Sequence, residues 1–145
     1  MYTHLLIATD GSVLAQEALE QGVALAKKLE AKVTIVTVTE AWHSVVVGDA
    51  AVGFPIDEYE NANAILATQT LTKAQSVAIK AGLKSETVHV KDSYPADGII
   101  NTAEKLGCDL IVMASHGRRG LTRLLLGSQA NNVVTHSTIP VLICR

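Results

Sequence analysis

The sequence predicts an α/β fold, with one open, doubly wound parallel sheet of five strands in the order 3-2-1-4-5 and four helices on its two faces. Three observations predict the α/β class, the parallel sheet and the single domain, and the strand order is the one assumed for such a sheet. Short apolar, strand-like runs alternate with amphipathic helical stretches, as in a mainly parallel sheet. The runs HLLIAT and LIVMA are almost wholly apolar, which is typical of central strands covered on both faces. The 145 residues show no repeat or linker, so we expect one domain over residues 1–145.

The first half of the chain supplies two strands and two helices. Strand His4–Thr9 precedes a helix from about Ser12 to Leu29, in which apolar residues recur at helical spacing. The second strand is Lys32–Val38. A long helix from about Asp57 to Ala81 then stops at Gly82, a residue type that is common just past helix ends.

The second half supplies three strands and two helices. Pro95 opens one helix, as proline often does in a first turn, and that helix ends near Gly107. The remaining elements are the strands Glu86–Val90, Leu110–Ala114 and Val141–Cys144 and a last helix from about Ser128 to His136.

The segment Glu40–Pro55 is a long, irregular connection between a strand and a helix. It holds Trp42 and Phe54, two of the five aromatic residues of the chain. Connections of this length are often functional. Two interpretations remain open: a surface loop that packs its apolar residues onto the core, or a lid or partner surface.

Composition bounds the classes of function. With 48% hydrophobic and 18% charged residues the chain should fold, and a net charge of −2 argues against nucleic acid or an anionic membrane as a general partner. The N-terminus lacks the basic region of a secretory signal, and no apolar run approaches the about 20 residues of a membrane span. Cys108 and Cys144 form no C-x-x-C motif. We therefore expect a cytoplasmic protein with two buried free thiols.

A ligand site is expected beyond the carboxyl ends of the first and fourth strands, where the strand order reverses. Asp10 follows the first strand, and a loop bounded by Gly117 and Gly127 follows the fourth. Gly127 and Ser128 stand where the last helix begins, and unpaired N–H groups there favour a phosphate. Simpler interpretations also remain: Ser128 as an ordinary N-cap and Asp10 as a cap of the first helix, a role for which Ser12 competes.

Three arginines of the Gly-bounded loop suit a phosphate as well. Arg118, Arg119 and Arg123 lie together in the sequence, where they would either screen phosphate charge or remain solvated.

The segments LLIATDGS, DLIVMASHG and LLLGSQANNVVTHSTIPVLIC resemble the universal stress protein family, and the similarity covers essentially the whole chain. ATP-binding members of that family carry G-x-x-G followed after nine residues by G-[ST]. Here Gly117, Gly127 and Ser128 match that motif, while Ala114 replaces its first glycine. The extra methyl group is tolerable unless the position needs a positive φ or a very close phosphate approach.

The resemblance implies a cytoplasmic stress-response protein that binds an adenine nucleotide, ATP or AMP, as a sensor or regulator. It implies dimerisation through Val141–Cys144, since an apolar edge strand invites pairing, and protein partners that the sequence does not name. The nucleotide-binding residues it implies are Ala8, Thr9, Asp10, Val38, Met113, Ala114, Gly117, Gly127, Ser128 and Gln129.

Two alternatives stand beside that function. One is a slow ATPase, with His116 as a proton carrier, although no P-loop lysine is present. The other is a dimeric interaction module that does not bind ATP, which Ala114 keeps open. The five histidines lack a metal-ligand spacing, so Mg²⁺ or Mn²⁺ would arrive only with the nucleotide.

Overall fold

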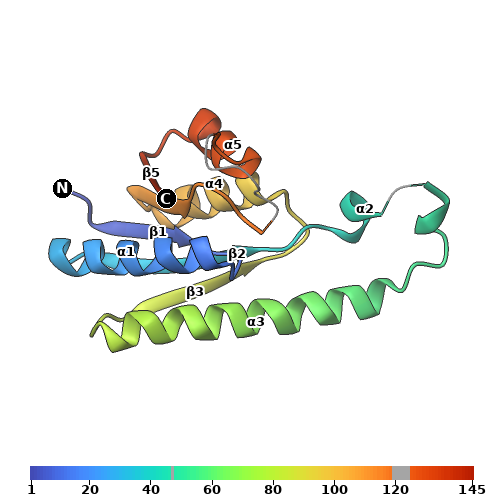
Figure 1. Cartoon of the computed structure of the whole chain (residues 1–145), viewed down its shortest axis with the longest axis horizontal. Coiled ribbons are helices and arrows are strands. Elements are labelled where there is room, and N and C mark those ends of the chain that lie inside the picture. Colours follow the sequence, from blue (N-terminus) through green and yellow to red (C-terminus); the bar gives the residue numbers. More distant parts are fainter. Residues whose placement is uncertain (47, 119–124) are drawn as a thin grey trace.

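The computed structural model describes residues 1–46, 48–118 and 125–145 of the chain. All the strands and long helices expected from the sequence are present, and each of their bounds agrees with the expected one or differs from it by one residue (Figure 1). The strands are β1 (His4–Ala8), β2 (Lys32–Val38), β3 (Ser85–Val90), β4 (Leu110–Ala114) and β5 (Val141–Cys144). The helices are α1 (Val13–Leu29), α2 (Trp42–Val45), α3 (Ile56–Lys80), α4 (Pro95–Leu106) and α5 (Ser128–His136), with a 3-10 helix at Gly48–Ala51.

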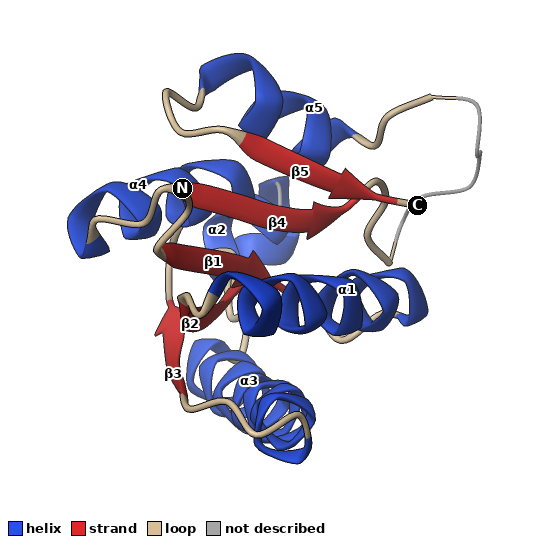
Figure 2. Ribbon diagram, turned by 90° about the vertical axis from the view of Figure 1, so that its left-hand side faces the viewer, coloured by secondary structure: helices blue, strands red, loops and turns tan. Residues whose placement is uncertain are grey.

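The strands form one parallel sheet in the order β3-β2-β1-β4-β5, which confirms the predicted fold class and order (Figure 2). β1 is central, since Leu5 pairs with Val33 of β2 on one side and with Leu110 of β4 on the other. The first connections add strands on one side of β1 and the later ones add strands on the other. The switch in direction therefore lies between β1 and β4.

Alternate residues of β1 enter two separate hydrophobic cores. Leu5 and Ile7 lie in the core beneath α1 and α3, whereas Leu6 and Ala8 lie in the core beneath α4 and α5. Figure 2 shows these helix pairs on opposite faces of the sheet. Leu5, Leu6 and Ile7 are fully buried, and each such side chain contributes about 1.5–3 kcal/mol to folding. Double-sided burial is the reason the strand reads as an unbroken apolar run.

The carboxylate of Asp109 holds the amino end of β1 beside β4. It accepts hydrogen bonds from the Thr3 N–H (2.8 Å), the Thr3 hydroxyl (2.8 Å) and the His4 N–H (3.0 Å). Partial burial raises the pKa of Asp109, but the hydrogen bonds from His4 and Thr3 outweigh it, so the pKa lies below its ordinary value. This contact joins two segments that are about a hundred residues apart in sequence. It aligns the amino ends of β1 and β4 with each other.

The segment Glu40–Pro55 contains α2 and the 3-10 helix, and it projects from the sheet together with the first turns of α3 (Figure 1). The rings of Trp42 and Phe54 stack with centroids 6.0 Å apart, and Phe54 meets Tyr59 of α3 edge-on at 5.9 Å. Neither hydrophobic core contains Trp42 or Phe54. The interpretation that these aromatics pack onto the core is therefore wrong, because they pack on one another and on α3 instead.

Two further expectations concern the whole chain. Cys108 and Cys144 are free and buried, as predicted. Across residues 1–46, 48–118 and 125–145, no helix is both long enough and apolar enough to span a bilayer.

Candidate functional site

The carboxyl ends of β1 and β4 lie side by side, as the sequence analysis expected of the ligand site. The strands pair in register from Leu5 with Leu110 to Ile7 with Val112, so the residues that follow them meet at one edge of the sheet. Thr9 and Ser115, the first residues past the two strands, are both buried. The turn after β1 and the loop after β4 therefore lie side by side at this edge, where the sequence predicts a crevice for a ligand.

Asp10 joins these two segments through its carboxylate. One oxygen, Oδ1, accepts a hydrogen bond from the Ser12 N–H, and the other, Oδ2, accepts one from the Arg118 N–H, both at 2.9 Å. Asp10 does not cap α1: Ser12 is the N-cap, and its hydroxyl accepts from the Ala15 N–H at 3.2 Å. The main role of Asp10 in this structure is to hold the loop after β4 against the turn after β1.

Gly117 is required by that contact. A Cβ atom at position 117 would lie 2.8 Å from Asp10 Oδ2, closer than a carbon and a carboxylate oxygen approach without displacement. The glycine therefore lets the loop backbone come within hydrogen-bond distance of Asp10. A side chain here would displace the Asp10 carboxylate, and that shift would weaken its hydrogen bond with the Arg118 N–H.

Gly127 packs just as closely against the start of the same loop. Its N–H donates to the Ser115 carbonyl at 2.9 Å, and a Cβ atom at position 127 would lie 2.8 Å from that oxygen. The glycine is therefore needed to bring the two ends of the loop together. Its position is explained by contact with backbone, whatever ligand the loop holds.

Ser128 is the first residue of α5, and Gly127 occupies the N-cap position, where no side chain caps the helix. The interpretation of Ser128 as an ordinary N-cap is therefore wrong. The Ser128 side chain is exposed and Gln129 is half-buried. A helix start with no capping side chain presents N–H donors and the positive end of its dipole, which together suit an anion.

The four apolar candidates divide between the two faces of the sheet. Ala8, Val38 and Met113 belong to the core beneath α4 and α5, whereas Ala114 belongs to the core beneath α1 and α3. Val38 packs tightly on α4, since a Cβ atom on Gly98 would lie 2.9 Å from its methyl groups. Met113 and Ala114 are adjacent in the strand, yet their side chains point in opposite directions.

Arg118 is the one arginine of the loop that the structure describes, because Arg119 and Arg123 lie outside the described residues. Its guanidinium lies over the start of α1: a Cβ atom on Gly11 would be 3.2 Å from Arg118 Nη2 and 3.1 Å from the Thr70 hydroxyl of α3. The guanidinium therefore sits on the α1 and α3 side of the sheet, where Gly11, with φ of 78°, leaves room for it.

Ser115 was not among the site residues predicted from the sequence, and His116 was named there only as a proton carrier. Ser115 binds Gly127 through its carbonyl and contacts His116 Nδ1 through its hydroxyl at 3.0 Å. His116 thus has the positional hydrogen bond expected of a loop residue. The only signal for Ser115 in the sequence is its place between a predicted strand and Gly117, and that place does not reveal a partner twelve residues away.

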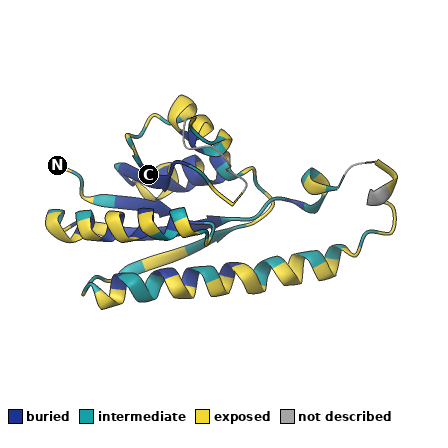
Figure 3. Ribbon diagram, viewed as in Figure 1, coloured by how far each residue is buried: buried dark blue, intermediate teal, exposed yellow. Residues whose placement is uncertain are grey.

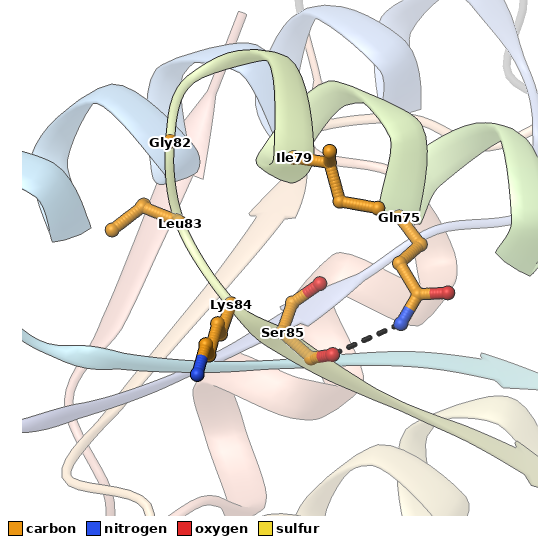
Figure 4. A pocket seen from close by; sticks show the side chains of 6 residues that line it. All are labelled: Gln75, Ile79, Gly82, Leu83, Lys84 and Ser85. Atoms are coloured by element: carbon orange, nitrogen blue, oxygen red, sulfur yellow. Dashed lines mark hydrogen bonds between the residues drawn. The ribbon is translucent and has the colours of Figure 1, made fainter.

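Two hollows among the described residues lie elsewhere. A shallow one of about 480 Å³ is lined by Gln75, Ile79, Gly82, Leu83, Lys84 and Ser85, where α3 turns into β3 (Figure 4). There the Gln75 amide donates to the Ser85 carbonyl at 3.0 Å, and the buried Ser85 hydroxyl has no hydrogen-bond partner in the described part of the chain. Its lining combines Ile79 and Leu83 with the polar side chains of Gln75, Lys84 and Ser85. It lies beside the amino end of β3, away from the carboxyl ends of β1 and β4.

A smaller hollow of about 70 Å³ lies at the carboxyl ends of β2 and β3, with Thr39, Glu40, Tyr59, Glu60, Asn63, His89, Lys91 and Asp92 around it. The Thr39 hydroxyl contacts His89 Nε2 at 2.9 Å. Burial, and then the charge of Lys91, lower the pKa of His89, so its ring is neutral near pH 7. No three His, Cys, Asp or Glu side chains within the described ranges gather closely enough to hold a metal ion.

Comparison with known proteins places the chain in one family. The model of the universal stress protein family matches residues 1–145. The universal stress protein YxiE of Bacillus subtilis is 34% identical over 151 residues, covering 100% of both chains. The solved structure of the universal stress protein UspA from Lactobacillus plantarum has a TM-score of 0.84 at 26% identity, covering 99% of this chain and 98% of that one.

Two more distant structures share the fold. A universal stress protein solved in complex with cAMP has a TM-score of 0.72 at 24% identity, over 99% of this chain and 97% of that one. A universal stress protein from Archaeoglobus fulgidus, solved in complex with dAMP, has a TM-score of 0.70 at 22% identity, over 99% and 98%. With the family model matched from end to end, the chain belongs to the universal stress protein family.

Proposed function

We propose that the crevice between β1 and β4 binds an adenine nucleotide, ATP or AMP, and that the protein acts in the stress response as a nucleotide-dependent sensor or regulator. The observation that carries this proposal is the start of α5. No side chain caps that helix, and its first residues follow a glycine whose backbone packs on the loop after β4. A phosphate would supply the acceptors that the first N–H groups of α5 lack.

Each candidate residue has a role in this proposal. Gly117, Gly127, Ser128 and the Gln129 backbone surround the phosphates, while Ala8, Thr9 and Asp10 border the ribose and adenine. Asp10 already accepts two N–H groups, but a carboxylate has about four lone-pair sites and can also accept a ribose hydroxyl. Val38 and Met113 contribute the apolar edge of the site, whereas Ala114, whose methyl group lies in the core beneath α1 and α3, takes part only through its backbone.

Related proteins support an adenine nucleotide over a bare phosphate. Two members of the same fold family were solved with cAMP and with dAMP, and both ligands combine an adenine base with a phosphate. Within the described ranges no cluster of metal-ligating side chains is present. A Mg²⁺ or Mn²⁺ ion would therefore enter with a nucleotide, held mainly by phosphate and water oxygens.

The test is a thermal shift with ATP and magnesium. A ligand at 100 times its Kd stabilises a protein by about 2.7 kcal/mol, which raises the Tm of a domain of this size by roughly 5–15 °C. Ser128→Asp should abolish the shift, because its carboxylate repels phosphate, while the free protein keeps its stability, because an acidic residue favours a helix start. Ser128→Asn, which has the same shape without the charge, should keep most of the shift.

This pair is preferable to Gly127→Val, whose side chain would strike the Ser115 carbonyl and disturb the loop even without a ligand. Equal shifts in Ser128→Asp and Ser128→Asn would place the nucleotide elsewhere and refute the site. No shift in the wild type at millimolar ATP would favour the dimeric interaction module. Release of phosphate in step with binding would favour the slow ATPase over a sensor.

A further inference from the structure

The projecting segment formed by residues 41–46 and 48–66, here called the arm, exposes apolar side chains. Val52 is 85% exposed, Ile65 59% and Leu66 48%. Leu66 lies two helical turns beyond Tyr59, and this spacing places both on one face of α3, so Leu66 continues the face of α3 on which the aromatic stack lies. Figure 3 shows this part of α3 in exposed and intermediate colours, and the buried residues of α3 begin only at Ala67. An exposed apolar patch of this kind marks an interaction site.

The arm is also acidic. No Lys or Arg occurs between Lys32 and Lys73, although the chain has 12 of them. The same stretch holds five of the 14 acidic residues of the chain: Glu40, Asp49, Asp57, Glu58 and Glu60. The last four are exposed. An apolar surface that is edged by carboxylates and contains neither Lys nor Arg, with His43 as its histidine, is thus built into one part of the fold.

The arm is held in shape by its own contacts. Besides the stacking of Trp42, Phe54 and Tyr59, the Tyr59 hydroxyl donates to the Glu40 carbonyl at 3.1 Å and ties α3 to the base of the arm. A surface that is already ordered loses less entropy when a partner binds.

The negative charge of the arm determines which kind of partner can bind to it. A twofold contact between two copies would bring the same acidic patch against itself, and an anionic membrane would repel it. We propose that the arm is a docking surface for a basic amphipathic helix of another protein, whose apolar face covers Val52, Leu66 and the aromatic stack while its Lys and Arg side chains meet the carboxylates. Helix recognition by an apolar surface and charge complementarity are established modes of recognition.

Fluorescence of Trp42 provides the test, because it is the only tryptophan of the chain and lies in the arm. The probe is a synthetic Leu and Lys peptide of about 18 residues, or five turns, patterned as an amphipathic helix and added without nucleotide. Its titration should change Trp42 emission to saturation, and the affinity should fall as salt is raised from 0.05 to 0.3 M, since salt screens exposed charges. A Leu and Glu peptide of the same pattern, and a scrambled Leu and Lys peptide, should bind at least about tenfold more weakly.

Two variants of α3 make the location testable. Leu66→Lys should weaken binding of the Leu and Lys peptide by about tenfold, the loss typical of a hot-spot side chain. Ile79→Lys is the matched control, because Ile79 is 64% exposed near the other end of the same helix, and it should leave the affinity unchanged. The Tm of both variants, measured without peptide, checks that they fold.

Several outcomes would overturn the proposal. Equal losses in Leu66→Lys and Ile79→Lys would place the peptide away from the arm, and equal binding of the scrambled peptide would reduce the effect to net charge. A fall in the native mass of the protein alone in Leu66→Lys would show that a second copy covers the arm. Stronger binding of the arm to phosphatidylcholine vesicles than to the peptide would make it a membrane contact.

Discussion

Ala114 is the residue that the resemblance drawn from the sequence sets in place of the first motif glycine, and the structure shows how an alanine fits at this position. Its methyl group lies in the core beneath α1 and α3, it is 7% exposed, and its backbone pairs with Cys144 of β5. Among the described residues other than glycine, only Glu30 and Asp92 have a positive φ. The position therefore needs no glycine conformation, and the extra methyl group points into the protein core.

We expect Ala114→Gly to lower the stability of the protein without improving nucleotide affinity. Losing one buried methyl group and adding backbone freedom in a strand together cost about 1–2 kcal/mol. Urea denaturation would measure that loss, and titration calorimetry with ATP would measure the affinity. Ala31→Gly, which is 6% exposed and remote from the crevice, is the control. Clearly tighter ATP binding in Ala114→Gly alone would mean that the methyl group limits phosphate approach.

At the scale of single elements, β5 is the edge strand whose exposed side favours pairing with another strand. It is an edge strand of the sheet, and Leu142 in its middle is 38% exposed while its last residue, Cys144, is buried. Unpaired backbone groups along an apolar edge favour pairing with another strand. The other edge strand, β3, presents the charged and polar side chains of Glu86 and Thr87 to solvent, which discourages such pairing.

We therefore predict a homodimer formed through Val141–Cys144. Light scattering should give about twice the monomer mass, and Leu142→Lys should shift the protein toward monomer, because a buried, unpaired ammonium group destabilises an interface. The same change at the opposite edge of the sheet, Thr87→Lys, should leave the mass unchanged. A wild-type protein that stays monomeric at high concentration would contradict the prediction.

At the scale of the whole molecule, the reactivity of the Cys108 and Cys144 thiols measures how well the two cores exclude solvent. Burial, and then the neighbouring Asp109 carboxylate, raise the pKa of Cys108 to about 11, and burial raises the pKa of Cys144. A thiol with a raised pKa in the folded state stabilises the fold below the ordinary thiol pKa of about 8.5. That contribution to stability is lost as the pH rises from the ordinary thiol pKa toward the raised pKa of the folded state.

We expect both thiols to resist labelling by a disulfide reagent at pH 8 until the protein unfolds. The reactive thiolate is scarce in the folded state and the sulfur atoms are covered, so the labelling rate should follow the opening of the core as urea is raised. Val52→Cys, at a site that is 85% exposed, should label at once and serves as the internal standard. Fast labelling of the wild type without urea would show that the core opens locally.

The sequence by itself predicted the class of the fold, the order of its strands and the edge at which we propose the site. Hydrophobic period and strand length are local properties, and parallel strands joined by right-handed crossovers leave few arrangements open. The strand LIVMA, which is buried at every position, and the start of α4 at Pro95 could therefore be predicted from local sequence. Gly117 and Gly127 were also singled out from their place between a strand and a helix.

Only the tertiary structure decided what those residues touch. Asp10 contacts Arg118, a partner 108 positions away, and Gly127 is required by the Ser115 carbonyl. The arm projects from the core although Trp42 and Phe54 are aromatic, because Trp42 and Phe54 stack on each other and Phe54 packs on Tyr59. Such contacts depend on which segments the sheet brings together, and the pattern of any one segment contains no information about a neighbour that is distant in sequence.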